Sequence, residues 1–144
     1  MEDQQRLNSL LNEINTYRQQ AELIQQQIEM IQASIAEVDA LFATLDDIEG
    51  KESIEAFVPV GAGSFIKGEL KSTDEIIVSI GSGIAIKKDA DGAREILSGQ
   101  KEELIDSRDK MLANLQQTTD IVGNLQAQAE QIAAAAQGNM TQMG

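Results

Sequence analysis

The sequence predicts a mainly helical α+β fold, in which two long helices form an antiparallel coiled-coil hairpin and two central β-hairpins join them. Three observations predict it: an unbroken heptad pattern in the first third of the chain, a weaker one in the last third, and a period of two between them. The expected parts are a first helix at 1–48, a β module at 49–90, a second helix at 91–137 and a flexible tail at 138–144.

The first helix is predicted by a continuous stripe of apolar residues. From Leu7 to Leu45, alternating steps of three and four residues always meet an apolar or aromatic side chain. Polar residues such as Gln25 fill the positions between, so the helix is not apolar all round. A period of 3.5 residues sustained in this way is typical of a left-handed coiled coil.

The second helix shows the same period, interrupted by polar residues such as Lys101 and Arg108. Asp89 or Asp91 can accept hydrogen bonds from the free amides of its first turn, and Gly138 stands where a helix would naturally stop. At 1.5 Å per residue the two helices are roughly 70 and 65 Å long. The matched lengths favour an antiparallel hairpin, although helices from two chains would explain the stripes equally well.

The β module is predicted by alternating apolar and polar residues between Ile54 and Lys88. Two segments, Gly61-Ala62-Gly63 and Gly81-Ser82-Gly83, have the composition of tight turns, so each joins two strands into a β-hairpin. Pro59 has no N–H to donate, which predicts an edge strand or a bulge there.

Two hairpins of this size do not bury a core by themselves, so their apolar faces and open edges need a partner. The favoured partner is another copy of the chain or a related subunit, added edge to edge. The expected oligomerisation residues are Phe57, Val58, Val60, Phe65, Ile66, Leu70, Ile76, Val78, Ile80, Ile84 and Ile86.

Composition excludes several classes of function. Cysteine and histidine are both absent, which excludes disulfides, thiolate or imidazole metal sites and Ser-His-Asp triads. The net charge of −13 argues against nucleic acid as a partner, because phosphate recognition needs a basic face. No apolar run is long enough for a signal peptide or a membrane span.

Three motifs resemble ligand sites but fit turns and helix ends better. The glycines of the two turns precede strand-like residues, whereas a phosphate loop precedes a helix. Residues 89–92 begin like a calcium loop, but the glycine comes too early and no closing glutamate follows. The carboxylates of residues 46–49 have no apolar pocket to tune an acid–base pair. We therefore expect no enzyme, no cofactor and no metal.

The free end of the coil is a second candidate surface. If Ile48 pairs with Arg94, Leu10 faces position 132, so the leucine-rich start lies opposite an alanine-rich segment. Small methyl groups cover leucines poorly, and each uncovered leucine forgoes about 1.5–3 kcal/mol of burial. This end is either a frayed coil terminus or a hydrophobic tip that holds other chains. The expected client-binding tip residues are Leu7, Leu10, Leu11, Ile14, Leu125, Ile132, Met140 and Met143.

The linker also resembles a known family. Residues 57–65 (FVPVGAGSF) and 76–88 (IIVSIGSGIAIKK) are similar to the first and second hairpins of the α-type subunits of archaeal prefoldins. Two hairpins instead of one mark the α type over the β type. The resemblance covers essentially the whole chain and is most specific in this linker, since coiled-coil stripes occur in many families.

The resemblance implies a cytoplasmic, ATP-independent holding chaperone. Two α and four β subunits of that family assemble through their hairpins into a β-barrel body with six coiled coils. The coil tips capture unfolded polypeptides and deliver them to a group II chaperonin. The partners implied for this chain are therefore prefoldin β-type subunits, another α copy, unfolded polypeptides and the chaperonin, with no nucleic acid and no membrane.

Two other interpretations remain open. A structural coiled-coil spacer or filament-forming subunit would use the same helices and hairpins, but would assemble in an open-ended way. An enzyme with a ligand site in the hairpin loops is the weaker alternative, because no residue constellation supports it. The identity of the clients, the subunit that contacts the chaperonin and the stoichiometry are not encoded in any recognisable motif.

Overall fold

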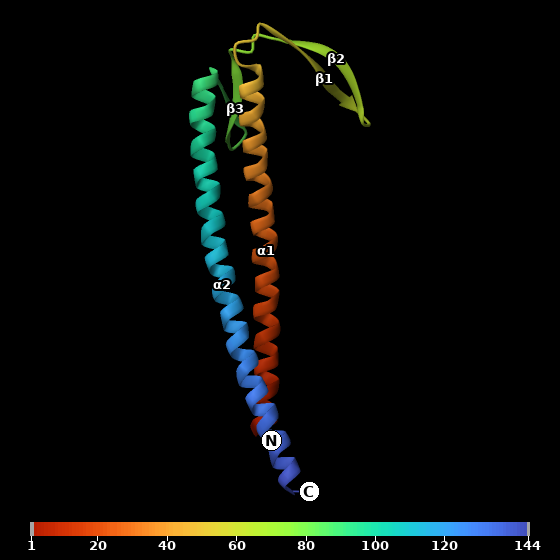
Figure 1. The fold of residues 1–144 in the computed structure, drawn as a ribbon, viewed down its shortest axis with the longest axis vertical. Coiled ribbons are helices and arrows are strands. Elements are labelled where there is room, and N and C mark those ends of the chain that lie inside the picture. The colour runs from red at the N-terminus through yellow and green to blue at the C-terminus, as the bar shows by residue number, and fades with distance from the viewer. Residues whose placement is uncertain (1, 144) are drawn as a thin grey trace. The chain divides into compact units, whose positions relative to one another are not determined.

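The computed structural model describes the backbone of residues 2–143 and the side chains of residues 2–138. Along the chain, one long helix precedes two β-hairpins and a second long helix follows them, as the sequence predicts (Figure 1). The elements in chain order are α1 (Glu2–Ile48), β1 (Ser53–Gly61), β2 (Ser64–Lys71), β3 (Ile76–Gly81), β4 (Ile84–Lys88) and α2 (Ala90–Met143).

The chain divides into two compact units, which are described separately. The coil unit combines Met1–Gln32 with Asp106–Gly144, and therefore holds the first part of α1 and the last part of α2. The hairpin unit is Ala33–Ile105, which holds the end of α1, both β-hairpins and the start of α2.

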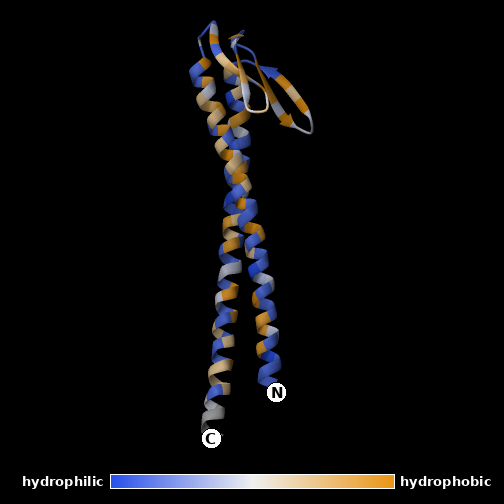
Figure 2. Cartoon of the chain, turned by 90° about the vertical axis from the view of Figure 1, so that its right-hand side faces the viewer, coloured by the Kyte–Doolittle hydropathy of each residue, from blue (hydrophilic) through white to orange (hydrophobic). Residues whose placement is uncertain are grey.

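In the coil unit, segments of α1 and α2 lie side by side (Figure 1). Leu10, Ile14 and Ala129 are buried at the centre of this contact, surrounded by half-buried apolar side chains. Figure 2 shows hydrophobic positions recurring along both helices between hydrophilic ones. The heptad stripe predicted for the first helix is confirmed, since each of its positions from Leu7 to Leu45 is buried or half-buried.

In the hairpin unit, two ion pairs show that the helices run antiparallel. Arg94 of α2 pairs with Asp46 of α1, and Lys101 pairs with Asp39, so the numbers rise on one helix as they fall on the other. Between the helices and β3 lies a small core of Leu45, Val78, Ala93 and Leu97. Leu45 is its largest fully buried side chain, at 1% exposed.

The helix ends are set by local backbone chemistry. Gly50 follows the last turn of α1 with a φ of 76°, the left-handed conformation that commonly closes a helix. Asp89 precedes α2, and its Oδ1 accepts a hydrogen bond from the Gly92 N–H at 2.8 Å. Of the two aspartates considered from the sequence, Asp89 is therefore the N-terminal cap.

The second helix extends further than the sequence indicates. We expected it to end at 137 and a flexible tail to follow at 138–144, whereas α2 continues to Met143. Gly138 does not adopt the positive φ seen at Gly50, so it does not end the helix. Neither helix contains, within the described residues, a stretch long and apolar enough to cross a membrane.

The two hairpins have the same construction. Each is an antiparallel two-stranded sheet closed by a two-residue loop, Ala62-Gly63 or Ser82-Gly83, in which both residues have positive φ. This is the type I′ turn, whose twist matches that of the strands. Each also has a register shift just before its turn, between Pro59 and Gly61 or between Ser79 and Gly81. Pro59 thus lies on an edge strand beside a bulge, as expected.

Candidate assembly surface and coil tip

The β1–β2 hairpin leaves its apolar side chains uncovered. Val58 and Ile66 are register partners on one face, and Phe57 and Phe65 lie on the other face near the turn. All four side chains are exposed, and Phe57 reaches 72%. Since aromatic and aliphatic side chains on both faces meet solvent, this hairpin has the composition of a surface that a partner covers.

The β3–β4 hairpin instead uses one face inside its own chain. Val78 is only 3% exposed and packs with Leu45, Ala93 and Leu97, while Ile76 is half-buried against the same core. Both residues were expected to serve oligomerisation; Val78 is instead buried within its own chain, whereas for the half-buried Ile76 the expectation stays a prediction. The reason is that side chains alternate along a strand, so the face carrying Ile76 and Val78 covers the helices.

The opposite face of β3 exposes a residue that the sequence analysis missed. Ile77 lies between the half-buried Ile76 and the buried Val78 and is 69% exposed. Its neighbours in the run are all aliphatic, so alternation alone did not show which of them faces solvent. Ile80 and Ile84 are also exposed, whereas Ile86 is half-buried opposite Val78. The remaining predicted residues, Val60 and Leu70, are exposed on the first hairpin.

The predicted tip residues differ in their exposure within the coil unit. Leu10 and Ile14 are buried, at 8% and 4% exposed, which corrects the expectation that alanines leave them uncovered. The larger side chains of Val122, Leu125 and Ile132 pack in the same cluster and complete the cover. Leu7 is half-buried, as are Leu125 and Ile132.

Leu11 is the exposed member of the predicted tip. Its side chain is 47% exposed and lines a shallow hollow with Ile14 and Ala129, beside Arg18 and Glu130. The last two predicted tip residues, Met140 and Met143, have side chains outside the described residues. Among the tip residues whose side chains are described, Leu11 is thus the one large aliphatic side chain that lies open beside the closed apolar cluster.

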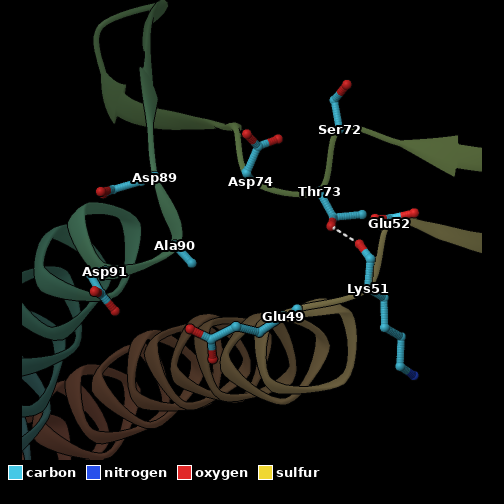
Figure 3. A pocket seen from close by; sticks show the side chains of 10 residues that line it. Glu49, Lys51, Glu52, Ser72, Thr73, Asp74, Asp89, Ala90 and Asp91 are labelled. Carbon is cyan, nitrogen blue, oxygen red and sulfur yellow. Dashed lines mark hydrogen bonds between the residues drawn. The ribbon is translucent and has the colours of Figure 1, made fainter.

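A hollow where the helices meet the hairpins is lined in part by acidic side chains (Figure 3). The contacts of its residues hold the helices and the connecting segments together. Asp89 caps α2, and the Thr73 hydroxyl donates to the Lys51 carbonyl oxygen across the two connecting segments. Glu49 accepts a hydrogen bond from Arg94 Nη2 at 2.8 Å. This hydrogen bond and the guanidinium charge hold the pKa of Glu49 below its ordinary value. Among the described residues no group of acidic side chains has the arrangement of a metal site.

Comparison with known proteins identifies the architecture. A family model described as a prefoldin subunit matches residues 17–135. The chain belongs to the prefoldin family. Prefoldin subunits are chaperone subunits, and the resemblance of the linker hairpins to the α type is confirmed by the relatives below.

Two relatives are both called prefoldin subunit alpha. The protein from Methanobrevibacter smithii is 73% identical over 100% of this chain and 99% of its own length. The protein from Methanosphaera stadtmanae is 36% identical over 70% of this chain and 72% of its own length. The similarity to archaeal prefoldin α subunits thus extends through both helices and both hairpins.

A solved structure has the same fold. It is the cryo-EM structure of filamentous PFD from Methanocaldococcus jannaschii, with a TM-score of 0.69 over 81% of this chain and 98% of that chain. The two sequences are 23% identical, so this likeness shows the prefoldin fold alone.

Proposed function

We propose that this chain is the α-type subunit of an ATP-independent holding chaperone, which captures unfolded polypeptides and passes them to a group II chaperonin in the cytoplasm. The observation that carries the proposal is the β1–β2 hairpin, whose apolar side chains are uncovered on both faces. In a member of the prefoldin family, such a hairpin is best explained as the part that joins subunits.

Assembly would bring this chain together with β-type prefoldin subunits and a second copy of itself, two α with four β. Burying Phe57, Phe65 and their aliphatic neighbours against partner strands removes apolar area from water at about 25 cal/mol per Å². The strands would close into the β-barrel body inferred for the family. Closure also removes the exposed strand edges, which otherwise favour uncontrolled aggregation.

Client capture would use the free ends of the coils. Leu11 and the hollow beside it offer an apolar contact that is already open, while Leu10 and Ile14 are covered by α2. A single contact of this size is weak, but several coil ends held by one body act at high effective concentration. Release needs no nucleotide if the client moves to a partner that binds it more tightly.

The capture site is tested by aggregation of a denatured client diluted into the assembled complex. Leu11→Ser removes the exposed tip leucine, and Leu23→Ser is the matched control, because Leu23 is also exposed on α1 but lies outside the tip. We expect the first variant to suppress light scattering less than the second. Equal suppression by both would place capture on the body or on the partner subunits.

Two further measurements complete the test. Removing residues 1–11 and 134–144 should abolish suppression while the complex still assembles. Suppression that survives this truncation contradicts tip capture. Transfer of a labelled client from the complex to a chaperonin tests the delivery step, and a client that stays bound would limit the proposal to holding.

The main alternative is a structural spacer or filament-forming subunit. The solved structure with the same fold is of a filamentous prefoldin, and this observation supports considering the alternative. The discriminating measurement is the mass of the assembly. Fibres formed by the chain alone would favour the alternative, whereas a finite particle that needs a β-type partner would favour the chaperone subunit.

A further inference from the structure

The two hairpins carry the same pair of facing side chains in different surroundings. Val58 lies opposite Ile66 in the first hairpin, and Val78 lies opposite Ile86 in the second. Val58 is 44% exposed and Ile66 is 60% exposed, whereas Val78 is 3% exposed and Ile86 is half-buried. The chemistry of the pair is therefore matched, and only its surroundings differ.

Two contacts hold the second hairpin to the helices. Val78 packs with Leu45 of α1 and Leu97 of α2 in the small core of the hairpin unit. Beside it, Gln100 Nε2 donates a hydrogen bond to the Ser79 carbonyl oxygen at 2.9 Å. Opening of this hairpin would therefore uncover buried apolar side chains and break a hydrogen bond to α2.

The first hairpin has no such anchor. The structure describes every residue of β1 and β2, and none of them is buried or belongs to an apolar core. Lys67 and Glu55 form an ion pair at 3.3 Å, but this contact joins the two strands of the same hairpin. This hairpin can therefore open without uncovering a core.

The middle of the first hairpin is also weakly packed. Gly68 and Ala56 are register partners there, so two very small residues face each other. Side-chain pairs across the strands are the contacts that stabilise a hairpin, and a glycine contributes none. A two-stranded hairpin is marginally stable in water even when its pairs are large. The type I′ turn does not distinguish the hairpins, because both have it.

We propose that in the free chain β3–β4 stays closed on the helices while β1–β2 opens and re-forms, and that β1–β2 becomes fixed only when a partner subunit covers it. The first half of this inference concerns the chain alone, and the second half rests on the proposed assembly function. Segments with few buried contacts open at a small cost in free energy. The second hairpin is thus a preformed contact, and the first hairpin is ordered after it.

Hydrogen–deuterium exchange tests the order of each hairpin. The chain is measured alone, at a concentration at which sedimentation shows a monomer, and again in the complex with β-type subunits. In the free chain, we expect the strand amides of β3 and β4 to exchange at least about tenfold more slowly than those of β1 and β2, because their opening requires loss of the Val78 contacts. In the complex, the amides of both hairpins should be protected.

Two matched valine substitutions locate the anchor. Val78→Ala should bring the free-chain exchange of the second hairpin close to that of the first, whereas Val58→Ala should leave the second hairpin unchanged. If Val78→Ala also speeds exchange of the helices, Gln100→Met is the second variant, because it removes the donor to Ser79 and keeps the length of the side chain. It should speed exchange of β3 and β4 alone. Unchanged exchange of the second hairpin in both variants overturns the anchor.

A glycine substitution tests the weak middle of the first hairpin. A Cβ on Gly68 would lie 3.5 Å from Val58 Cγ2, which is an ordinary contact. Gly68→Ala should therefore slow the free-chain exchange of β1 and β2 about two- to fivefold. Gly99→Ala is the control, because Gly99 lies on α2 with nothing within 4 Å of an added Cβ, and it should leave the first hairpin unchanged. Equal effects of the two variants on the first hairpin contradict the inference.

The outcomes separate this inference from the proposed function. If no complex with β-type subunits forms, the proposed function is wrong. If the complex forms but the free chain already protects both hairpins equally, the ordering in two stages is wrong. If β1 and β2 exchange as fast in the complex as in the free chain, a partner does not fix the first hairpin, and the inference is overturned in that way too.

Discussion

Arg94 and Glu49 join the two helices where they meet the hairpins, with Nη2 of the arginine 2.8 Å from Oε2 of the carboxylate. The same nitrogen lies 2.8 Å from Asp46 Oδ1. Acidic residues at the end of α1 lie at the negative pole of that helix, and a basic residue at the start of α2 lies at the positive pole of its helix. Each charge is therefore unfavourable toward the dipole of its own helix. Pairing them compensates both, and it explains why the carboxylates of residues 46–49 are structural.

Stability should therefore depend on pH through Glu49. Its folded-state pKa is lowered, first by the hydrogen bond from Arg94 and then by the arginine charge. A lowered pKa means that the pair stabilises the folded chain above the ordinary carboxyl value and that this stabilisation is lost as the pH falls through the lowered pKa. Glu49→Gln should lower the melting temperature at pH 7, and the difference from the unsubstituted chain should vanish at acid pH. A difference independent of pH would contradict the role of charge.

The core between the helices and β3 should be sensitive to cavity formation. Leu45 is almost completely buried, so Leu45→Ala should destabilise the chain by roughly 2–5 kcal/mol. Leu23→Ala is the control, because its side chain is 60% exposed and little burial is lost. Chemical denaturation of the two variants measures the difference. A similar loss in both would mean that the Leu45 core contributes little.

The cap of α2 gives a third prediction. Asp89→Ala removes the acceptor for the Gly92 amide and should cost about 0.5–2 kcal/mol of unfolding free energy. Asp91→Ala is the matched control, since Asp91 is highly exposed and its nearest charge contact with Arg94 is 3.7 Å long. Thermal unfolding compares them. If Asp91→Ala is the more destabilising, the capping assignment fails.

Glycines inside α2 should respond in opposite directions to alanine. A Cβ on Gly123 would meet nothing within 4 Å, so Gly123→Ala should stabilise the helix by about 0.5–1 kcal/mol. A Cβ on Gly92 would lie 2.8 Å from Asp89 Oδ1, so Gly92→Ala should disturb the cap and destabilise. Urea unfolding of both variants checks the signs. If Gly92→Ala stabilised the chain instead, the Asp89 side chain would have to move aside for the new Cβ without loss of unfolding free energy.

The sequence predicted those features that depend on neighbours along the chain. The heptad stripe from Leu7 to Leu45, the turns at Ala62-Gly63 and Ser82-Gly83 and the bulge beside Pro59 all have local causes, namely periodicity, positive φ and a missing N–H. It did not predict the coil contacts that depend on the facing helix. Leu10 and Ile14 were expected to be poorly covered, yet the larger side chains of α2 pack around them.

The sequence by itself thus determined that this protein consists of two long coiled-coil helices connected by two β-hairpins. The reason is that the heptad period and the two-residue period depend only on the order of residues along the chain. Only the tertiary structure decided which face of the second hairpin is a core and which is a surface. Ile76, Ile77 and Val78 are all aliphatic. Because the helices lie beside one face of β3, Val78 is buried and Ile77 is exposed. Likewise, Gln100 reaches Ser79 only because folding brings α2 to that strand, and no local pattern records such a contact.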